Sequence, residues 1–204
     1  MSERPRRPPI RASRRPWRRA AYASLDFETT GLDYDTDAVV AFGVVPVDEG
    51  RVVLARSVHQ LVAPSVPSSP VSMKIHGILP GDLRSSPTIE EAAPALRRGL
   101  DERFVVAWYA SVEIAFLRRA FGGSVRWWRR RTVDVRDLVI ALEGADRDAR
   151  FGLTTTAERY GVPVANPHEA FDDALVTAQL LLVVATKLEA RGVRTVRDLA
   201  RLSR

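Results

Sequence analysis

The stretch Ser24-Leu25-Asp26-Phe27-Glu28-Thr29-Thr30-Gly31 ends an apolar run with two acidic residues one position apart. Residues i and i+2 of a β-strand point to the same face. We therefore expect Asp26 and Glu28 to lie side by side, with Leu25 and Phe27 on the opposite face. Two like charges at that spacing repel unless a proton or a cation lies between them. The stretch indicates either an exposed strand end with solvated acids or one half of a cation site.

Around this stretch the sequence predicts an α/β fold. Three β-rich runs, 21–27, 38–47 and 51–62, come first, and the short link at 48–50 is typical of a hairpin between antiparallel strands. After a Pro/Ser-rich loop at 63–72, short apolar strands alternate with helices. The strands are expected at 104–108 and 133–135, and the helices at about 86–100, 111–121, 137–142, 153–160, 171–190 and 195–202. An antiparallel meander followed by such alternation favours a mixed sheet with helices packed on it.

Length and composition indicate one domain. The chain has 204 residues, 46% of them hydrophobic, and no cysteine, so any metal must be held by oxygen ligands or by the three histidines. Residues 1–19 contain eight arginines, four prolines and one acid, which predicts a disordered tail followed by a domain at 20–204. That tail could contact nucleic-acid phosphates or be an extension with little role. The longest mainly apolar run, 174–185, is too short for a bilayer, which favours a cytoplasmic protein without a membrane partner.

Two further segments carry acidic residues at element starts. His168-Glu169-Ala170-Phe171-Asp172-Asp173-Ala174 leads into a helix that is apolar on nearly all sides. Such a helix is buried, so an acid at its start needs a partner, although acids also favour helix N-termini in general. Glu113 falls in the first turn of a helix that follows a strand end, where the same general preference applies.

Taken together, these segments resemble the DEDDh (DnaQ-like) family of 3′-to-5′ exonucleases over about residues 20–190. The family's first motif is matched in full by 26–31, and its last motif by His168, Ala170, Asp173 and Ala174. The segments 73–78 and 132–134 are similar to its His-Gly-Ile segment and to a short strand. The middle motif differs, because Trp108 and Tyr109 stand where the family has His-Asn, and Glu113 stands where it has aspartate.

The resemblance implies a ribonuclease H-like sheet and a metal-dependent exonuclease that releases nucleoside 5′-monophosphates. By the same resemblance, two Mg²⁺ or Mn²⁺ ions would be held by Asp26, Glu28, Glu113 and Asp173, with His168 as the general base. The terminal nucleotide would lie near Thr29, Thr30, Gly31, His76 and Ile78. The implied partners are 3′ ends of single-stranded nucleic acid, and a DNA polymerase or repair complex could be a further partner.

Several alternatives stay open at this point. The chain could be a catalytically weak nucleic-acid-binding domain of the same fold, in which Glu113 misplaces one metal. It could also be an interaction module that its basic tail delivers to a replication or repair assembly. The run Arg126-Trp127-Trp128-Arg129-Arg130-Arg131 could stack and track a single strand, or its tryptophans could pack in the domain beneath solvated arginines. For His76, packing as an ordinary loop residue is an equal alternative, and the sequence does not choose DNA over RNA.

Overall fold

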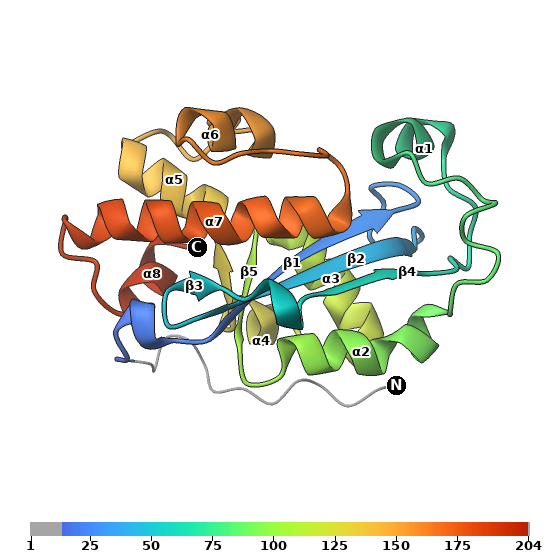
Figure 1. The fold of residues 1–204 in the computed structure, drawn as a ribbon, viewed down its shortest axis with the longest axis horizontal. Helices are drawn as coiled ribbons and strands as arrows, with labels where there is room; N and C mark the ends of the chain where they lie inside the picture. Colours follow the sequence, from blue (N-terminus) through green and yellow to red (C-terminus); the bar gives the residue numbers. More distant parts are fainter. Residues whose placement is uncertain (1–13, 204) are drawn as a thin grey trace.

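A computed structural model describes residues 14–203 as helices packed on both faces of a six-stranded mixed sheet (Figure 1). The strands are β1 (Tyr22–Thr29), β2 (Val39–Asp48), β3 (Arg51–Val52), β4 (Val58–Leu61), β5 (Phe104–Ala107) and β6 (Thr132–Asp134). Strands β1 and β2 pair antiparallel, as do β2 with β3 and β2 with β4. Strands β1, β5 and β6 run parallel. The predicted fold class, an antiparallel meander extended by parallel strands, is confirmed.

The predicted third strand at 51–62 is interrupted. A 3-10 turn, η3 (Leu54–Arg56), separates β3 from β4, and both pair with β2. Pro46 of β2 explains the break: its carbonyl accepts the N–H of Val53, but proline has no N–H to return to the ladder. The prediction of one continuous strand was therefore wrong at this point.

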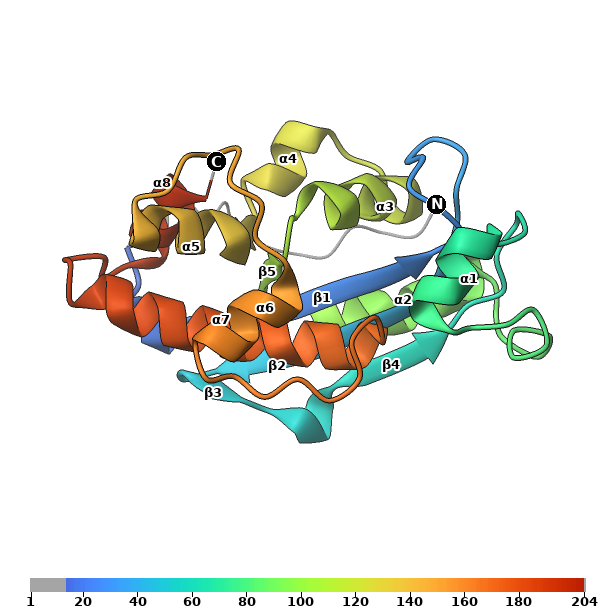
Figure 2. The ribbon, with the colours of Figure 1, turned by 90° about the horizontal axis from the view of Figure 1, so that it is seen from above.

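The helices form two layers, one on each face of the sheet (Figures 1 and 2). On one face lie α5 (Val135–Glu143), α6 (Leu153–Arg159), α7 (Ala170–Glu189) and α8 (Val196–Leu202), around one hydrophobic core. On the other lie α2 (Ile89–Leu100), α3 (Ser111–Phe121) and α4 (Val125–Arg129), around a second core. The long helix α7 runs across β1 and β2 in Figure 1. Among the described residues no helix is long and apolar enough to cross a membrane.

A glycine lets α7 approach the sheet closely. Gly43 lies opposite Asp26 in the β1–β2 ladder, and a Cβ atom at Gly43 would lie 2.2 Å from the carbonyl oxygen of Ala170. Real Cβ atoms do not approach an oxygen so closely, so only glycine fits beneath the first turn of α7. The backbone contact therefore sets the height of that turn above Asp26.

One helix start differs from the prediction, and two helices were not foreseen. The segment predicted as a loop at 63–72 ends in α1 (Pro70–His76), which begins at Ser69, whose hydroxyl accepts the N–H of Ser72. Helix α2 begins after Thr88, which forms a capping box with Glu91, and not at Ser86-Pro87. The short helix α4 had not been predicted. Each start follows a side-chain cap, which satisfies N–H groups that the helix itself leaves unpaired.

The ordered domain begins before Ala20. Trp17 is fully buried within η2 (Trp17–Arg19), and its carbonyl accepts the Tyr22 hydroxyl at 3.0 Å. Pro16 forms an isolated bridge with Thr195 near α8. Residues 1–13 of the predicted disordered tail at 1–19 lie outside the described residues. The last residues of that segment pack against the domain.

Candidate active site

Three carboxylates converge where β1 passes beneath the start of α7. Asp26 and Glu28 come from β1 and Asp173 from the first turn of α7, and each offers an oxygen within 4.8 Å of the others. The side chains of Leu25 and Phe27 pack in the core beneath α2–α4, so the two acids face α7, as the strand period predicts. Glu28 and Asp173 are 9% and 8% exposed. The three form the acid cluster.

The electrostatics of the acid cluster favour a cation. Burial, reinforced by Asp173 and Glu169, raises the pKa of Glu28 from 4.5 to about 8. Burial also raises the pKa of Asp26, and the nearby charges of Glu113 and Glu28 add to the effect. The pKa of Asp173 is likewise raised by burial. Carboxylates crowded in this way are stabilised by a divalent ion with oxygen ligands, and the donor set suits Mg²⁺ or Mn²⁺.

Glu113 approaches the acid cluster from α3. It lies in the first turn, is 3% exposed, and its buried Oε2 has no hydrogen-bond partner among the described residues. Burial raises the pKa of Glu113, and Asp134 and Glu28 add to the rise. Burying a carboxylate oxygen without a partner costs folding free energy, and a cation coordinated by that oxygen would remove this cost.

These shifts predict how stability depends on pH. The pKa of Glu28 is higher in the folded chain than in the unfolded chain, so the folded state binds the proton more tightly. In EDTA the free energy of unfolding should fall as pH rises from about 4.5 to about 8, by roughly 1.4 kcal/mol for each unit of pKa difference. Urea unfolding at pH 5, 6.5 and 8 measures this fall.

Millimolar Mn²⁺ should reverse that loss at pH 8, because an ion that binds only the folded state stabilises it. The pKa of Asp134, raised to about 6, acts in the same direction. Asp33, Asp48 and Asp198, whose pKa values are lowered, titrate below this window. Stability that stays level or increases between pH 5 and 8, or that ignores Mn²⁺, would contradict the assignment of a cation site.

His168 lies at the rim of the acid cluster. It precedes α7 with a φ of 65°, its side chain is exposed, and its backbone N–H donates to Oδ2 of Asp173 at 3.2 Å. The next residue, Glu169, caps α7 by accepting the N–H of Asp172, and its Oε1 lies 2.9 Å from Nε2 of His59 on β4. These contacts fix the backbone of the segment that carries His168 and Asp173.

The loop after β1 is held together by its own side chains. The hydroxyl of Thr30 donates to Asp37 and accepts the N–H of Ala38, at 2.7 and 2.9 Å. A Cβ atom at Gly31 would collide with the same Asp37 carboxylate, at 2.3 Å from Oδ2. Thr29 donates its hydroxyl to the carbonyl of Gly31. Thr30 is fully buried, so its side chain supports the loop, and any ligand would meet the backbone there.

His76 and Ile78 lie near the same end of β1. Figures 1 and 2 both draw α1, which ends at His76, beside the tip of the β1 arrow. The N–H of Ile78 donates to Nδ1 of His76 at 3.0 Å, which leaves the proton of a neutral imidazole on Nε2. Burial lowers the pKa of His76, and its ring contacts the backbone of Thr29. The structure thus brings both residues to the loop after β1.

Sequence reasoning assigned no role to Asp134, which organises the start of α3. Its carboxylate accepts the N–H groups of Tyr109, Ala110 and Arg136 at 3.2, 2.8 and 3.0 Å. Burial is the main cause that raises its pKa to about 6. The available signal was an aspartate between a short strand and a helix, a capping position. Asp134 also accepts the N–H groups of Tyr109 and Ala110, and these bonds depend on the pairing of β5 with β6.

The tryptophans of the 126–131 run pack inside the domain. Trp128 is 1% exposed and donates its Nε1–H to the carbonyl of Gly122 at 2.9 Å. Trp127 packs edge-on against Trp128, and the guanidinium carbon of Arg131 lies 3.8 Å from the centre of its ring. This arrangement favours the packing interpretation of the run over a surface on which bases stack.

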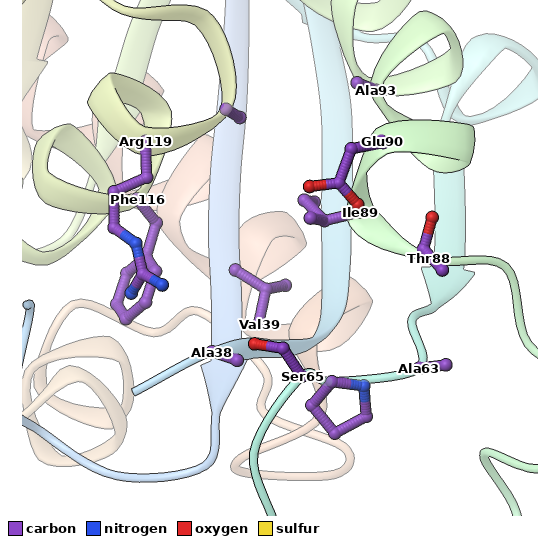
Figure 3. A pocket seen from close by; sticks show the side chains of 12 residues that line it. Ala38, Val39, Ala63, Ser65, Thr88, Ile89, Glu90, Ala93, Phe116 and Arg119 are labelled. Carbon is purple, nitrogen blue, oxygen red and sulfur yellow. The ribbon is translucent and has the colours of Figure 1, made fainter. Parts of the chain in front are cut away.

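A cavity of about 710 Å³ lies on the face of the sheet opposite the acid cluster. Figure 3 shows Phe116 and Arg119 of α3 on one side and Ile89 and Glu90 of α2 on the other, with Val39 between them. Its walls are mainly apolar, and the guanidinium of Arg119 lies over the ring of Phe116. No predicted site residue lines this cavity, so it is separate from the acid cluster and its surroundings.

Comparison with known proteins gives a consistent match. A family model described as "Exonuclease" (RNase T) matches residues 24–181. The chain is 30% identical over 187 residues to a PolC-type DNA polymerase III of Thermotoga petrophila, and 25% identical over 184 residues to the 3′-5′ exonuclease DinG of Staphylococcus saprophyticus. Each match covers 90% of this chain, but only 13% and 20% of the length of these relatives.

The fold also has solved counterparts. Exonuclease X, solved in complex with 5′ overhanging duplex DNA, superposes with a TM-score of 0.66 at 24% identity. The match covers 88% of this chain and 98% of exonuclease X. At that identity the likeness supports the fold.

Proposed function

This chain belongs to the exonuclease family whose model matches residues 24–181, and on that premise we propose that it is a metal-dependent 3′-to-5′ exonuclease. In this proposal it hydrolyses single-stranded DNA or RNA from the 3′ end and releases nucleoside 5′-monophosphates. The observation that carries the proposal is the acid cluster, whose carboxylate oxygens lie within 4.8 Å of one another beside the buried Glu113. The exonuclease domain would comprise residues 20–204, together with the turn at Trp17–Arg19 that packs against them.

Asp26, Glu28, Asp173 and Glu113 would hold two divalent ions. The raised pKa values and the unpaired Oε2 of Glu113 support this assignment, because both describe carboxylates that need positive charge. Two bound Mg²⁺ or Mn²⁺ ions supply stabilisation of the attacking and leaving oxygens of a phosphodiester. The longer side chain of Glu113 keeps the charge that the family's aspartate carries.

His168 would act as the general base. Histidine is the side chain that most often serves as a general base, so its imidazole would take the proton of the attacking water. Its backbone bond to Asp173 keeps it at the rim of the acid cluster, and its exposure leaves a route for the proton to solvent. A purely structural domain would need no histidine beside a cluster of acids.

The terminal nucleotide would lie between the loop after β1 and α1. The backbone at Thr29, Thr30 and Gly31 borders this region on one side, and His76 and Ile78 border it on the other. The relatives support a place in DNA metabolism: one is a PolC-type DNA polymerase III and the other a 3′-5′ exonuclease. A DNA polymerase or a repair complex is therefore the proposed partner in addition to 3′ ends.

The direct test uses oligonucleotides labelled at the 5′ end. With Mg²⁺ or Mn²⁺, a labelled single strand of DNA or RNA should shorten one nucleotide at a time from its 3′ end, and EDTA should stop the reaction because the carboxylates then hold no ion. Denaturing gels resolve the ladder, and chromatography identifies the mononucleotide. A strand that is bound but never cut would favour the catalytically weak domain. An internal cut, or cleavage that persists in EDTA, would refute the proposed mechanism.

A further inference from the structure

A second hollow, of about 640 Å³, lies at the carboxyl ends of β5 and β6. Strand β1 pairs in parallel with β5 up to Ser24 opposite Val106, so Asp26 and Trp108, each two residues further on, follow the same end of this pairing. Trp108 packs against the core beneath α5–α8, the same side of the sheet that the acid cluster occupies. The hollow and the acid cluster therefore lie at the same end and on the same side of the sheet. Its walls are Trp108, Tyr109, Arg136, Arg147, Asp148, Arg150 and Phe151.

The lining combines positive charge with aromatic rings. Three of its seven residues are arginines, one is an aspartate, and three carry aromatic rings. Guanidinium groups match phosphate geometry through paired hydrogen bonds, and aromatic faces stack on nucleobases whatever their sequence. A ligand with both a phosphate and a planar base fits this composition better than a purely apolar or purely anionic one.

The floor of the hollow is already organised. One amino group of Arg136 donates to the carbonyls of Arg147 and Ala149 at 3.2 and 2.8 Å, which holds the loop that carries Arg147 and Arg150. The guanidinium carbon of Arg136 lies 5.3 Å from the centre of the Tyr109 ring. The loop and the ring are therefore fixed relative to each other.

Tyr109 is held in a conformation that core packing does not explain. Its φ is 59°, an uncommon value for a residue with a bulky side chain, and its side chain is 50% exposed. The bond from its N–H to Asp134 maintains this backbone. Strained, exposed and anchored residues of this kind gather at ligand sites.

We propose that this hollow binds the nucleotide on the 5′ side of the bond to be cut, with Arg147 and Arg150 on its phosphate and Tyr109 and Trp108 against its base. The inference rests on the proposed function. The order of strands supports it: the region assigned to the terminal nucleotide lies at β1 on the α1 side, and the hollow lies beyond the acid cluster towards β5 and β6. A nucleic-acid strand whose 3′-terminal nucleotide lies near α1 and whose last phosphodiester lies at the acid cluster would reach the hollow with its next nucleotide.

The test measures binding of a fluorescein-labelled (dT)₆ by anisotropy in EDTA, where metal-dependent cleavage is off. The double variant Arg147→Gln/Arg150→Gln should weaken the Kd on the order of tenfold at 0.1 M salt, and should reduce the slope of log Kd against log salt by about 0.7 for each phosphate that is no longer neutralised. The matched control, Arg84→Gln/Arg98→Gln, removes the same charge from exposed positions outside the hollow and should bind like the wild type.

The outcomes separate this inference from the proposed function. If the hollow variant and the control bind alike, or if both weaken equally, the inference is overturned and only general charge matters. Hydrolysis of the p-nitrophenyl ester of thymidine 5′-monophosphate by the wild type tests the acid cluster separately, because this substrate contains a single nucleotide. A wild type that hydrolyses the ester while the hollow variant keeps its affinity for (dT)₆ would sustain the exonuclease and refute the hollow. A wild type that does not hydrolyse the ester, together with a hollow variant that binds (dT)₆ more weakly than the control does, would support the hollow as a nucleotide site and refute the exonuclease.

Discussion

Replacing Asp26 with asparagine is expected to lower the rate of metal-dependent cleavage by on the order of 10³-fold or more. Asparagine keeps the shape of the side chain but removes the charge that interacts with those of Glu113, Glu28 and Asp173. Loss of several kcal/mol of charge stabilisation in the transition state corresponds to a rate loss of this size. Single-turnover cleavage of a 5′-labelled strand at saturating Mg²⁺ measures it.

The same variant should be more stable than the wild type when no metal is present. Burial and the neighbouring acids raise the pKa of Asp26, so its charge opposes folding at pH 8, and asparagine removes that opposition. The melting temperature in EDTA should rise by several degrees. Glu158→Gln, which neutralises an exposed acid outside the acid cluster and the hollow, is the control and should change neither quantity. Full activity in Asp26→Asn, or a lowered melting temperature, would contradict the role given to this residue.

Gly43→Val is expected to have the largest effect on stability. Its Cβ atom would lie 2.2 Å from the carbonyl oxygen of Ala170, and the nearest atoms are all backbone, which cannot rotate away. Either β2 or the first turn of α7 must move, and overpacking of this kind costs roughly 1–3 kcal/mol or more. Urea unfolding should show the loss. Asp173 belongs to that turn, so its displacement should also lower the rate of cleavage, by a larger factor than the loss of folded protein explains.

The control for this substitution is Gly81→Ala. A Cβ atom there meets nothing within 4 Å, so the change should leave the free energy of unfolding within about 0.5 kcal/mol. A milder variant, Gly43→Ala, keeps the test informative if the valine variant does not fold. Wild-type stability in Gly43→Ala would show that α7 does not rest on β2 through this backbone contact.

The features that the sequence predicted are those that depend on local periodicity. Alternation along a strand was sufficient to put Asp26 and Glu28 on one face, and the apolar run from Ala174 was sufficient to identify the buried helix that carries Asp173. The position of Glu113 near them followed from the resemblance and from its place in a first helical turn. All these residues come together in the structure.

The features that the sequence did not predict depend on contacts between distant segments. Trp17 is surrounded by arginines, so composition indicated a disordered tail, yet its ring is buried beside residues near α8. The Pro/Ser-rich segment before Met73 hid a helix whose cap is Ser69. The part that Asp134 plays at Ala110 arises only when β6 lies beside β5. Local patterns carry no information about such pairings.

The bond between Asp134 and Ala110 has a consequence for the order of folding. Helix α3 has no side-chain cap of its own, and the N–H of Ala110, the residue just before it, donates to an aspartate 24 positions later in the chain. The start of α3, and with it the position of Glu113 near Asp26, therefore depends on a contact with β6, and Asp173 comes later still in the sequence. A half-made chain carries Asp26 and Glu28 without their companions. Assembly of the four acids thus requires segments from both ends of the domain.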